Sequence, residues 1–94
     1  MDEEHNSYLE IGESFEQTLN SLITVCFRLY FKELQRPVEK RNEELKTSFY
    51  NQFREVSRVK NSYLFSDIAA KQELILKYGP ELRKLIEIEI RDYL

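Results

Sequence analysis

The sequence holds only two glycines and two prolines among its 94 residues. These residue types end helices and build turns, so their scarcity predicts short connections and a chain made mostly of helices. Apolar residues make up 41% of the chain and charged residues 33%, a balance typical of folded domains rather than disordered segments. A chain of this length supports one domain with a single core. We therefore expect a single all-α domain.

Cysteine and long uninterrupted apolar runs are also scarce. Cys26 is the only cysteine, which excludes a disulfide within the chain and suits a reducing compartment. The most apolar segment, residues 19–34, is shorter than the roughly 20 residues that span a bilayer, and Arg28 and Lys32 interrupt it. The chain begins with acids from Asp2 onward, where a secretory signal would carry cations. We expect a cytoplasmic protein without a membrane span.

Residues suited to catalysis are few. His5 is the only histidine and lies in an acidic stretch, without the spacing of a true set of metal ligands. Cys26 lies between Val25 and Phe27, where a buried small apolar side chain is expected rather than a nucleophile. The two glycines are too far apart for a phosphate-binding loop. We therefore expect no enzymatic activity, no cofactor and no metal site.

The segment from Leu19 to Leu34 organises the chain. Ten of its sixteen residues are apolar. Four of its polar residues recur at steps of four, on one strip of a helix: Asn20, Thr24, Arg28 and Lys32. A helix that is polar on one narrow strip is normally covered by neighbours on several sides. The apolar seam continues back to Ile11, which predicts a helix over residues 8–35 after an acidic flexible lead over residues 1–7.

Further helices are predicted downstream. Pro37 ends the first helix, and we favour a tight turn there over a kink in one continuous rod. The second helix is predicted over residues 38–61, with a narrow apolar stripe that indicates an outer position. Gly79 and Pro80 predict the end of a third helix and the start of a fourth. Residues 86–90 alternate like a strand, although their context favours a helix.

Ser66 and Asp67 are capping residues that predict the start of the third helix near Ile68. Together these elements predict a three- to four-helix bundle over residues 8–94. Its first helix is expected to be long and mostly buried.

Aromatic residues are abundant, with six phenylalanines, six tyrosines and no tryptophan. Several of these rings do not fall on one stripe of the predicted helices. Tyrosines around an apolar centre are typical of protein contact surfaces, but a buried central helix also needs large neighbours. Both interpretations stay open. The candidates for a protein interface are Tyr30, Phe31, Tyr50, Tyr63, Phe65 and Tyr78.

Charge is distributed unevenly, with a net charge of -3. Residues 1–16 contain six acids and no lysine or arginine, whereas residues 28–60 contain nine bases and five acids. Part of the basic region forms a helical strip of cations around one tyrosine, which suits phosphate contact and base stacking. We favour the plainer interpretation, a solvated face that balances the acidic segment. The candidates for nucleic-acid contact are Lys46, Tyr50, Arg54, Arg58 and Lys60.

These observations predict a non-enzymatic protein-interaction module of the regulator, adaptor or inhibitor type. We expect it to bind another protein and to form homo-oligomers, since short helices leave apolar surface that association would cover. The alternative is a nucleic-acid-binding regulator that uses the basic strip. The net negative charge argues against bulk attraction to nucleic acid or to an anionic membrane.

Overall fold

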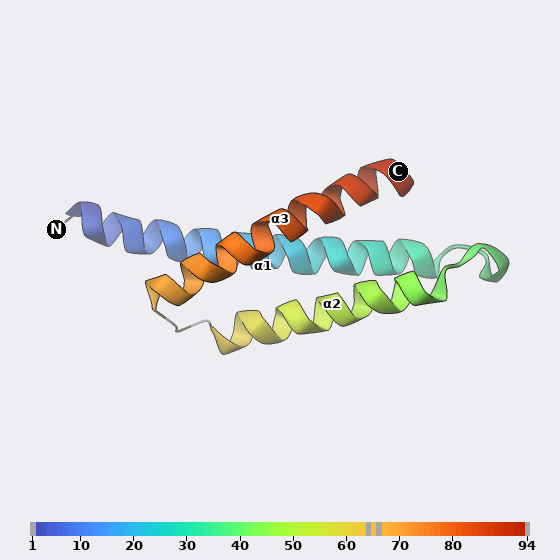
Figure 1. The fold of residues 1–94 in the computed structure, drawn as a ribbon, viewed down its shortest axis with the longest axis horizontal. Coiled ribbons are helices and arrows are strands. Elements are labelled where there is room, and N and C mark those ends of the chain that lie inside the picture. The colour runs from blue at the N-terminus through green and yellow to red at the C-terminus, as the bar shows by residue number, and fades with distance from the viewer. Residues whose placement is uncertain (1, 64, 66, 94) are drawn as a thin grey trace.

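In the computed structural model of this chain, every regular element of the described part is a helix (Figure 1). It describes the backbone of residues 2–63, 65 and 67–93, and within these the side chains from residue 14 onward. In chain order the elements are α1 (Asp2–Leu34), the short 3₁₀ helix η1 (Val38–Lys40), α2 (Glu43–Ser62) and α3 (Ile68–Asp92). No strand occurs in these residues, which confirms the predicted all-α bundle.

Helix α1 lies at the centre of the fold. Helix α2 runs back alongside it, and α3 then runs forward again and crosses it (Figure 1). Helix α1 packs against both of these helices, whereas no Cα atoms described in α2 and α3 lie within 8 Å of each other. The molecule is elongated, with principal extents of 59 × 24 × 16 Å. The central position predicted for the first helix is confirmed, and α2 and α3 approach each other only through side chains.

The apolar seam of α1 forms the centre of the core. Its members are separated by three or four residues, so they share one side of the helix, and none has exposed surface: Phe15, Leu19, Leu22, Cys26 and Leu29. The other helices contribute Phe49, Val56, Val59, Tyr78 and Leu85 to the same cluster. Burying one large apolar side chain stabilises a fold by about 1.5–3 kcal/mol, so this cluster supplies the main favourable contribution.

The side of α1 opposite the seam is less covered than the sequence predicts. Cys26 is fully buried, as expected, but Phe27, which was also expected to be covered, exposes 45% of its surface. Phe31 is equally exposed. Both flanking helices pack close to the seam, and two neighbours are too few to surround a third helix. The difference therefore reflects the number and placement of neighbours, which the local pattern does not contain.

Helix α1 also begins earlier than predicted. It starts at Asp2, whereas the sequence predicts a start near Tyr8 after a lead over residues 1–7. Acidic residues interact favourably with the positive end of the helix dipole, which is consistent with helix in this acidic stretch. The side chains of His5 and Ile11 lie outside the described residues.

Pro37 lies in a reversal of the chain, which confirms the predicted turn (Figure 1). Helix α2 begins later than the predicted start at Val38, which instead opens the short helix η1. The reason is a capping residue downstream. The side chain of Asn42 accepts a hydrogen bond from the backbone N–H of Leu45 at 3.0 Å and so fixes the first turn of α2.

Gly79 and Pro80 do not separate two helices, which corrects the prediction of a helix end at this point. Helix α3 runs through both residues without interruption. Gly79 does not have the positive φ of a C-terminal cap. Pro80 is exposed, so the backbone group that lacks a partner lies on the solvent side of the helix. Tyr78 and Leu85, on either side of Pro80, are buried in the same core and hold both halves of α3 against α1.

The start of α3 agrees with the sequence prediction. Asp67 accepts a hydrogen bond from the backbone N–H of Ala70 at 2.9 Å. Ser66, the other predicted cap, lies outside the described residues. Residues 86–90 are helical rather than extended. Within the described part of the chain, no helix is both long and apolar enough to cross a membrane.

Candidate interaction surface

Five aromatic rings from two helices form one continuous surface, which we call the aromatic face: Phe27, Tyr30 and Phe31 of α1, and Tyr50 and Phe53 of α2. Two ring pairs join the helices, Phe27 with Phe53 at 5.5 Å and Tyr30 with Tyr50 at 5.2 Å between centroids. Tyr50 and Phe53 stack at 6.2 Å with 22° between their planes. These distances fall in the range of about 4.5–7 Å in which aromatic pairs attract.

The aromatic face is open to solvent. Phe27 and Phe31 each expose 45% of their surface and Tyr50 exposes 40%. Tyr30 and Phe53 are partly buried against the core and connect these exposed rings to it. Isolated exposed rings are common in proteins, but a contiguous group of them marks a surface suited to binding.

Cations from the predicted basic strip border this surface. The guanidinium carbon of Arg54 lies 6.0 Å from the centroid of the Tyr50 ring, within reach of a cation–π contact. Arg58 lies one turn further along α2 and is exposed. Lys46 forms an ion pair with Glu43 at 2.7 Å, which neutralises part of the strip. Lys60, in the last turn of α2, is partly buried.

The six predicted interface residues are divided among three places. Tyr30, Phe31 and Tyr50 belong to the aromatic face, whereas Tyr63 follows the end of α2 and exposes 39% of its surface. Phe65 lies in the connection to α3 and exposes 94%. Tyr78 exposes only 3% and is a core residue, so it is not part of an open contact surface. The structure therefore brings together half of the predicted set.

Two members of the aromatic face were missing from the prediction. Phe27 lies in the segment that the sequence predicts to be covered, and Phe53 lies in the narrow apolar stripe predicted for the second helix. Phe27 and Phe31 are four residues apart and Tyr50 and Phe53 are three apart, a spacing that places each pair on one helix surface. This spacing was visible in the sequence, but the side on which the neighbouring helix would pack was not.

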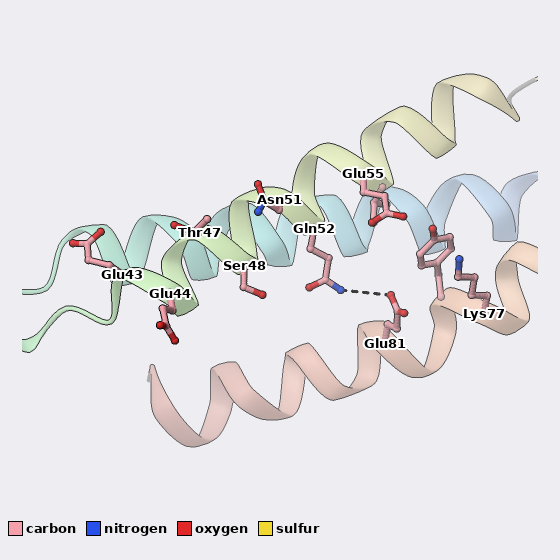
Figure 2. Close-up of a pocket in the computed structure, with 11 residues that line it drawn as sticks. Glu43, Glu44, Thr47, Ser48, Asn51, Gln52, Glu55, Lys77 and Glu81 are labelled. Atoms are coloured by element: carbon pink, nitrogen blue, oxygen red, sulfur yellow. Dashed lines mark hydrogen bonds between the residues drawn. The ribbon is translucent and has the colours of Figure 1, made fainter.

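A second concave surface lies between α2 and α3, as Figure 2 shows. This groove has a volume of about 750 Å³. The side chain of Gln52 spans it and donates a long hydrogen bond of 3.5 Å to Glu81 (Figure 2). Apart from Val56, the lining residues of α2 are polar or acidic: Glu43, Glu44, Thr47, Ser48, Asn51, Gln52 and Glu55. Helix α3 contributes Lys77, Tyr78 and Glu81.

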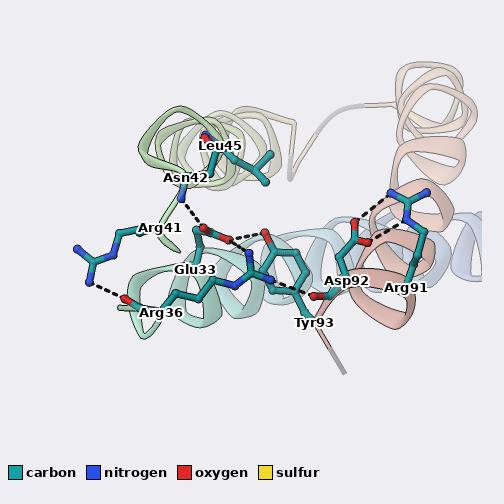
Figure 3. A network of polar contacts seen from close by, with 8 residues as sticks. All are labelled: Glu33, Arg36, Arg41, Asn42, Leu45, Arg91, Asp92 and Tyr93. Carbon is teal, nitrogen blue, oxygen red and sulfur yellow. Dashed lines mark hydrogen bonds and ion pairs between the residues drawn. The ribbon is translucent and has the colours of Figure 1, made fainter. Parts of the chain in front are cut away.

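A buried polar network joins the end of α1 to the end of α3 (Figure 3). Glu33 has no exposed surface, and its carboxylate accepts hydrogen bonds from the backbone N–H of Asn42 and the hydroxyl of Tyr93, each at 2.6 Å. Arg36 pairs with the same carboxylate at 3.2 Å and lies over the Tyr93 ring at 4.4 Å. Burial alone would raise the pKa of Glu33, but these donors and cations hold it below its ordinary value.

A second buried carboxylate connects the middle of α1 to α3. Glu89 accepts two hydrogen bonds from the guanidinium of Arg28, at 2.7 and 2.8 Å, and one from Lys32 at 3.3 Å. The bond from Arg28 contributes most to lowering the pKa of Glu89 below its ordinary value. Two residues of the polar strip on the first helix, Arg28 and Lys32, thus orient α3.

Both carboxylates and the cysteine are buried and engaged in the packing of the fold. Burial raises the pKa of the Cys26 thiol to about 12, which disfavours the thiolate that a nucleophile needs. The carboxylates of Glu33 and Glu89 are already engaged in ion pairs and hydrogen bonds within the fold. Over residues 14–63, 65 and 67–93, no three potential ligands gather in a way that could hold a metal ion.

Comparison with known proteins adds no relative. No protein-family model, no curated protein sequence and no solved structure matches this chain.

Proposed function

We propose that this protein is a non-enzymatic interaction module of the regulator, adaptor or inhibitor type, which binds a partner protein through its aromatic face. The proposal rests on one observation, the continuous group of five rings on α1 and α2, of which Phe27, Phe31 and Tyr50 are exposed to solvent. Aromatic side chains combine large contact area with few rotatable bonds, and they dominate the binding energy of many protein interfaces.

The proposed partner presents an apolar surface, and a second copy of this chain meets that requirement. Joining two aromatic faces would remove the same rings from water in both copies, as in a two-fold dimer. The proposal therefore includes homodimer formation. We also propose a cytoplasmic location, which suits a free buried thiol at Cys26.

The test compares Phe31→Glu with a matched control, Phe65→Glu. Both residues are exposed phenylalanines, but only Phe31 belongs to the aromatic face. Molar mass in solution and binding to partners purified and identified from the native host are measured for both variants, with helicity checked by circular dichroism. We expect Phe31→Glu to abolish binding and dimer formation and Phe65→Glu to leave them intact. Equal binding by the two variants and the unmodified protein would contradict the proposal.

Nucleic-acid binding is the second candidate function. The observation that favours it is the contact of Arg54 with the exposed ring of Tyr50, because a cation beside a ring suits backbone contact and base stacking. Under this alternative, retention on immobilised single-stranded nucleic acid falls steeply with salt, and Arg54→Glu removes it. Retention that does not depend on salt would reject it.

A further inference from the structure

The groove between α2 and α3 has the shape and charge of a binding site that the aromatic face does not use. We propose that it binds the arginine- or lysine-bearing face of an α-helix from a partner protein. This inference concerns a different surface from the proposed function and does not depend on it.

The open geometry of the fold supports a helical occupant. Helix α1 packs against both α2 and α3, but the described Cα atoms of α2 and α3 stay more than 8 Å apart. A helix laid along this opening takes the fourth position of a four-helix bundle. The segment of α2 from Glu43 to Glu55, which lines the groove, extends about 18 Å along the helix axis. This length matches about three turns of a bound helix.

The charge of the lining selects a basic partner. Four glutamates line the groove, against one lysine. Glu43 is already paired with Lys46 at 2.7 Å and lies 3.6 Å from Arg41. The other three, Glu44, Glu55 and Glu81, have no ion-pair partner among the described residues. Carboxylates without cations along one groove attract complementary charge and repel acidic segments.

Tyr78 provides an independent indication of a ligand. Its side chain is 3% exposed and lines the groove, so the small surface that it retains faces the opening. No described residue forms a hydrogen bond with its hydroxyl, and that oxygen is not enclosed by the core. A largely buried ring in the groove lining, whose hydroxyl has no partner within the fold, can donate to or accept from a polar group of a bound molecule.

The arrangement suits arginine better than a metal ion. The carboxylates are spread along the groove, and no group of three potential ligands converges in the described region. An arginine side chain carries five N–H donors in a planar fork, which can reach two carboxylates and a hydroxyl at once. Lys77 lies over the Tyr78 ring at 5.1 Å and competes for this position, so binding requires Lys77 to swing toward solvent.

The experiment measures fluorescence anisotropy of a labelled helical peptide of about 18 residues, with arginine at every fourth position on an alanine background. The control peptide has glutamine in place of arginine. The protein variants are Glu55→Lys and Glu81→Lys in the groove, and Glu87→Lys as the control. Glu87 is exposed and lies nine residues after Tyr78, on the opposite side of α3. Its substitution by lysine therefore changes the net charge as much as the groove variants do, but at a site outside the groove.

We expect the arginine peptide to bind saturably and the glutamine peptide not to bind. Each groove variant should weaken binding about tenfold, and Glu87→Lys should change it by less than about twofold. Tyr78→Phe removes only the hydroxyl and should weaken binding about threefold without altering helicity. Phe31→Glu in the aromatic face should leave peptide binding unchanged, so this result stands whether or not the proposed function holds.

Three results would overturn the inference. The first is equal binding of the two peptides or no saturable binding. The second is an equal loss of affinity in Glu87→Lys and Glu55→Lys, which would indicate attraction by overall charge. The third is a change in the molar mass of the protein alone in Glu55→Lys, because the groove would then hold a second copy of the chain.

Discussion

Glu33 and Glu89 are carboxylates placed where a small helical protein usually places apolar side chains. Each has different partners. Glu33 is stabilised by a backbone amide, a tyrosine hydroxyl and Arg36, and Glu89 by the guanidinium group of Arg28. Removing one partner of such a group costs more than the bond is worth, because the remaining charge stays buried. These two residues therefore fix the position of α3 along α1 more strictly than apolar contacts do.

The same carboxylates make stability depend on pH. The folded-state pKa of both Glu33 and Glu89 lies below the ordinary value of 4.5, so the unfolded chain binds more protons than the folded one in acid. Their stabilising contribution is complete above the unfolded pKa and is lost as pH falls through the folded one. We expect the free energy of unfolding in urea to be level from pH 7 to about pH 5.5 and to decrease below that.

Glu89→Gln identifies the source of this dependence. The amide cannot titrate, so the variant should be less stable at neutral pH and should lose less stability between about pH 5.5 and pH 3. Glu87→Gln, at an exposed site on the same helix, serves as the control and should follow the unmodified protein. Identical slopes for Glu89→Gln and the unmodified protein would show that Glu89 does not contribute.

The existence of the helices and the start of α3 could be predicted from the sequence, because apolar spacing and capping residues are local properties. The seam from Phe15 to Leu29 and the cap at Asp67 are confirmed. The prediction was wrong at the Gly79–Pro80 pair, because it treated a local helix-ending signal as decisive. Tyr78 and Leu85 pack into one core across that pair, and tertiary packing outweighed the missing backbone hydrogen bond.

Gly79→Ala tests whether α3 is one helix. Gly79 has helical backbone geometry without positive φ, and a Cβ atom added there would meet no atom within 4 Å. Alanine has the higher helix propensity, so we expect the free energy of unfolding to rise by about 0.5–1 kcal/mol. Thermal and urea unfolding measure the change. A helix that ended at Gly79 with a left-handed residue would be destabilised by this substitution instead.

At the scale of the whole molecule, the positions of the helices relative to one another could not be read from the sequence. The apolar pattern showed that α1 is central, but it did not show that both neighbours pack near one side of it. This placement explains why Phe27 is half-exposed and why Tyr78, a predicted interface residue, is buried. The aromatic face could be foreseen only in part, through Tyr30, Phe31 and Tyr50.

The arrangement predicts unequal local stability. Helix α1 is supported by two neighbouring helices, whereas α2 and α3 are each supported chiefly by α1. Native-state hydrogen exchange should therefore be slowest in residues 19–33 of α1. Val56→Ala, in the buried face of α2, should speed exchange in α2 more than in α3, since no described backbone contact connects those two helices. Equal acceleration in both helices would indicate that they unfold as one unit.

The gap between α2 and α3 also links ligand occupancy to folding. A molecule bound there contacts two helices that otherwise meet only through side chains. The unfolded chain has no such binding site, so the ligand binds only the folded state. Mass action then raises the free energy of unfolding by RT ln(1 + [L]/Kd), so the melting temperature climbs with ligand concentration. A thermal-shift screen of basic peptides would consequently rank them by how tightly each one occupies the groove.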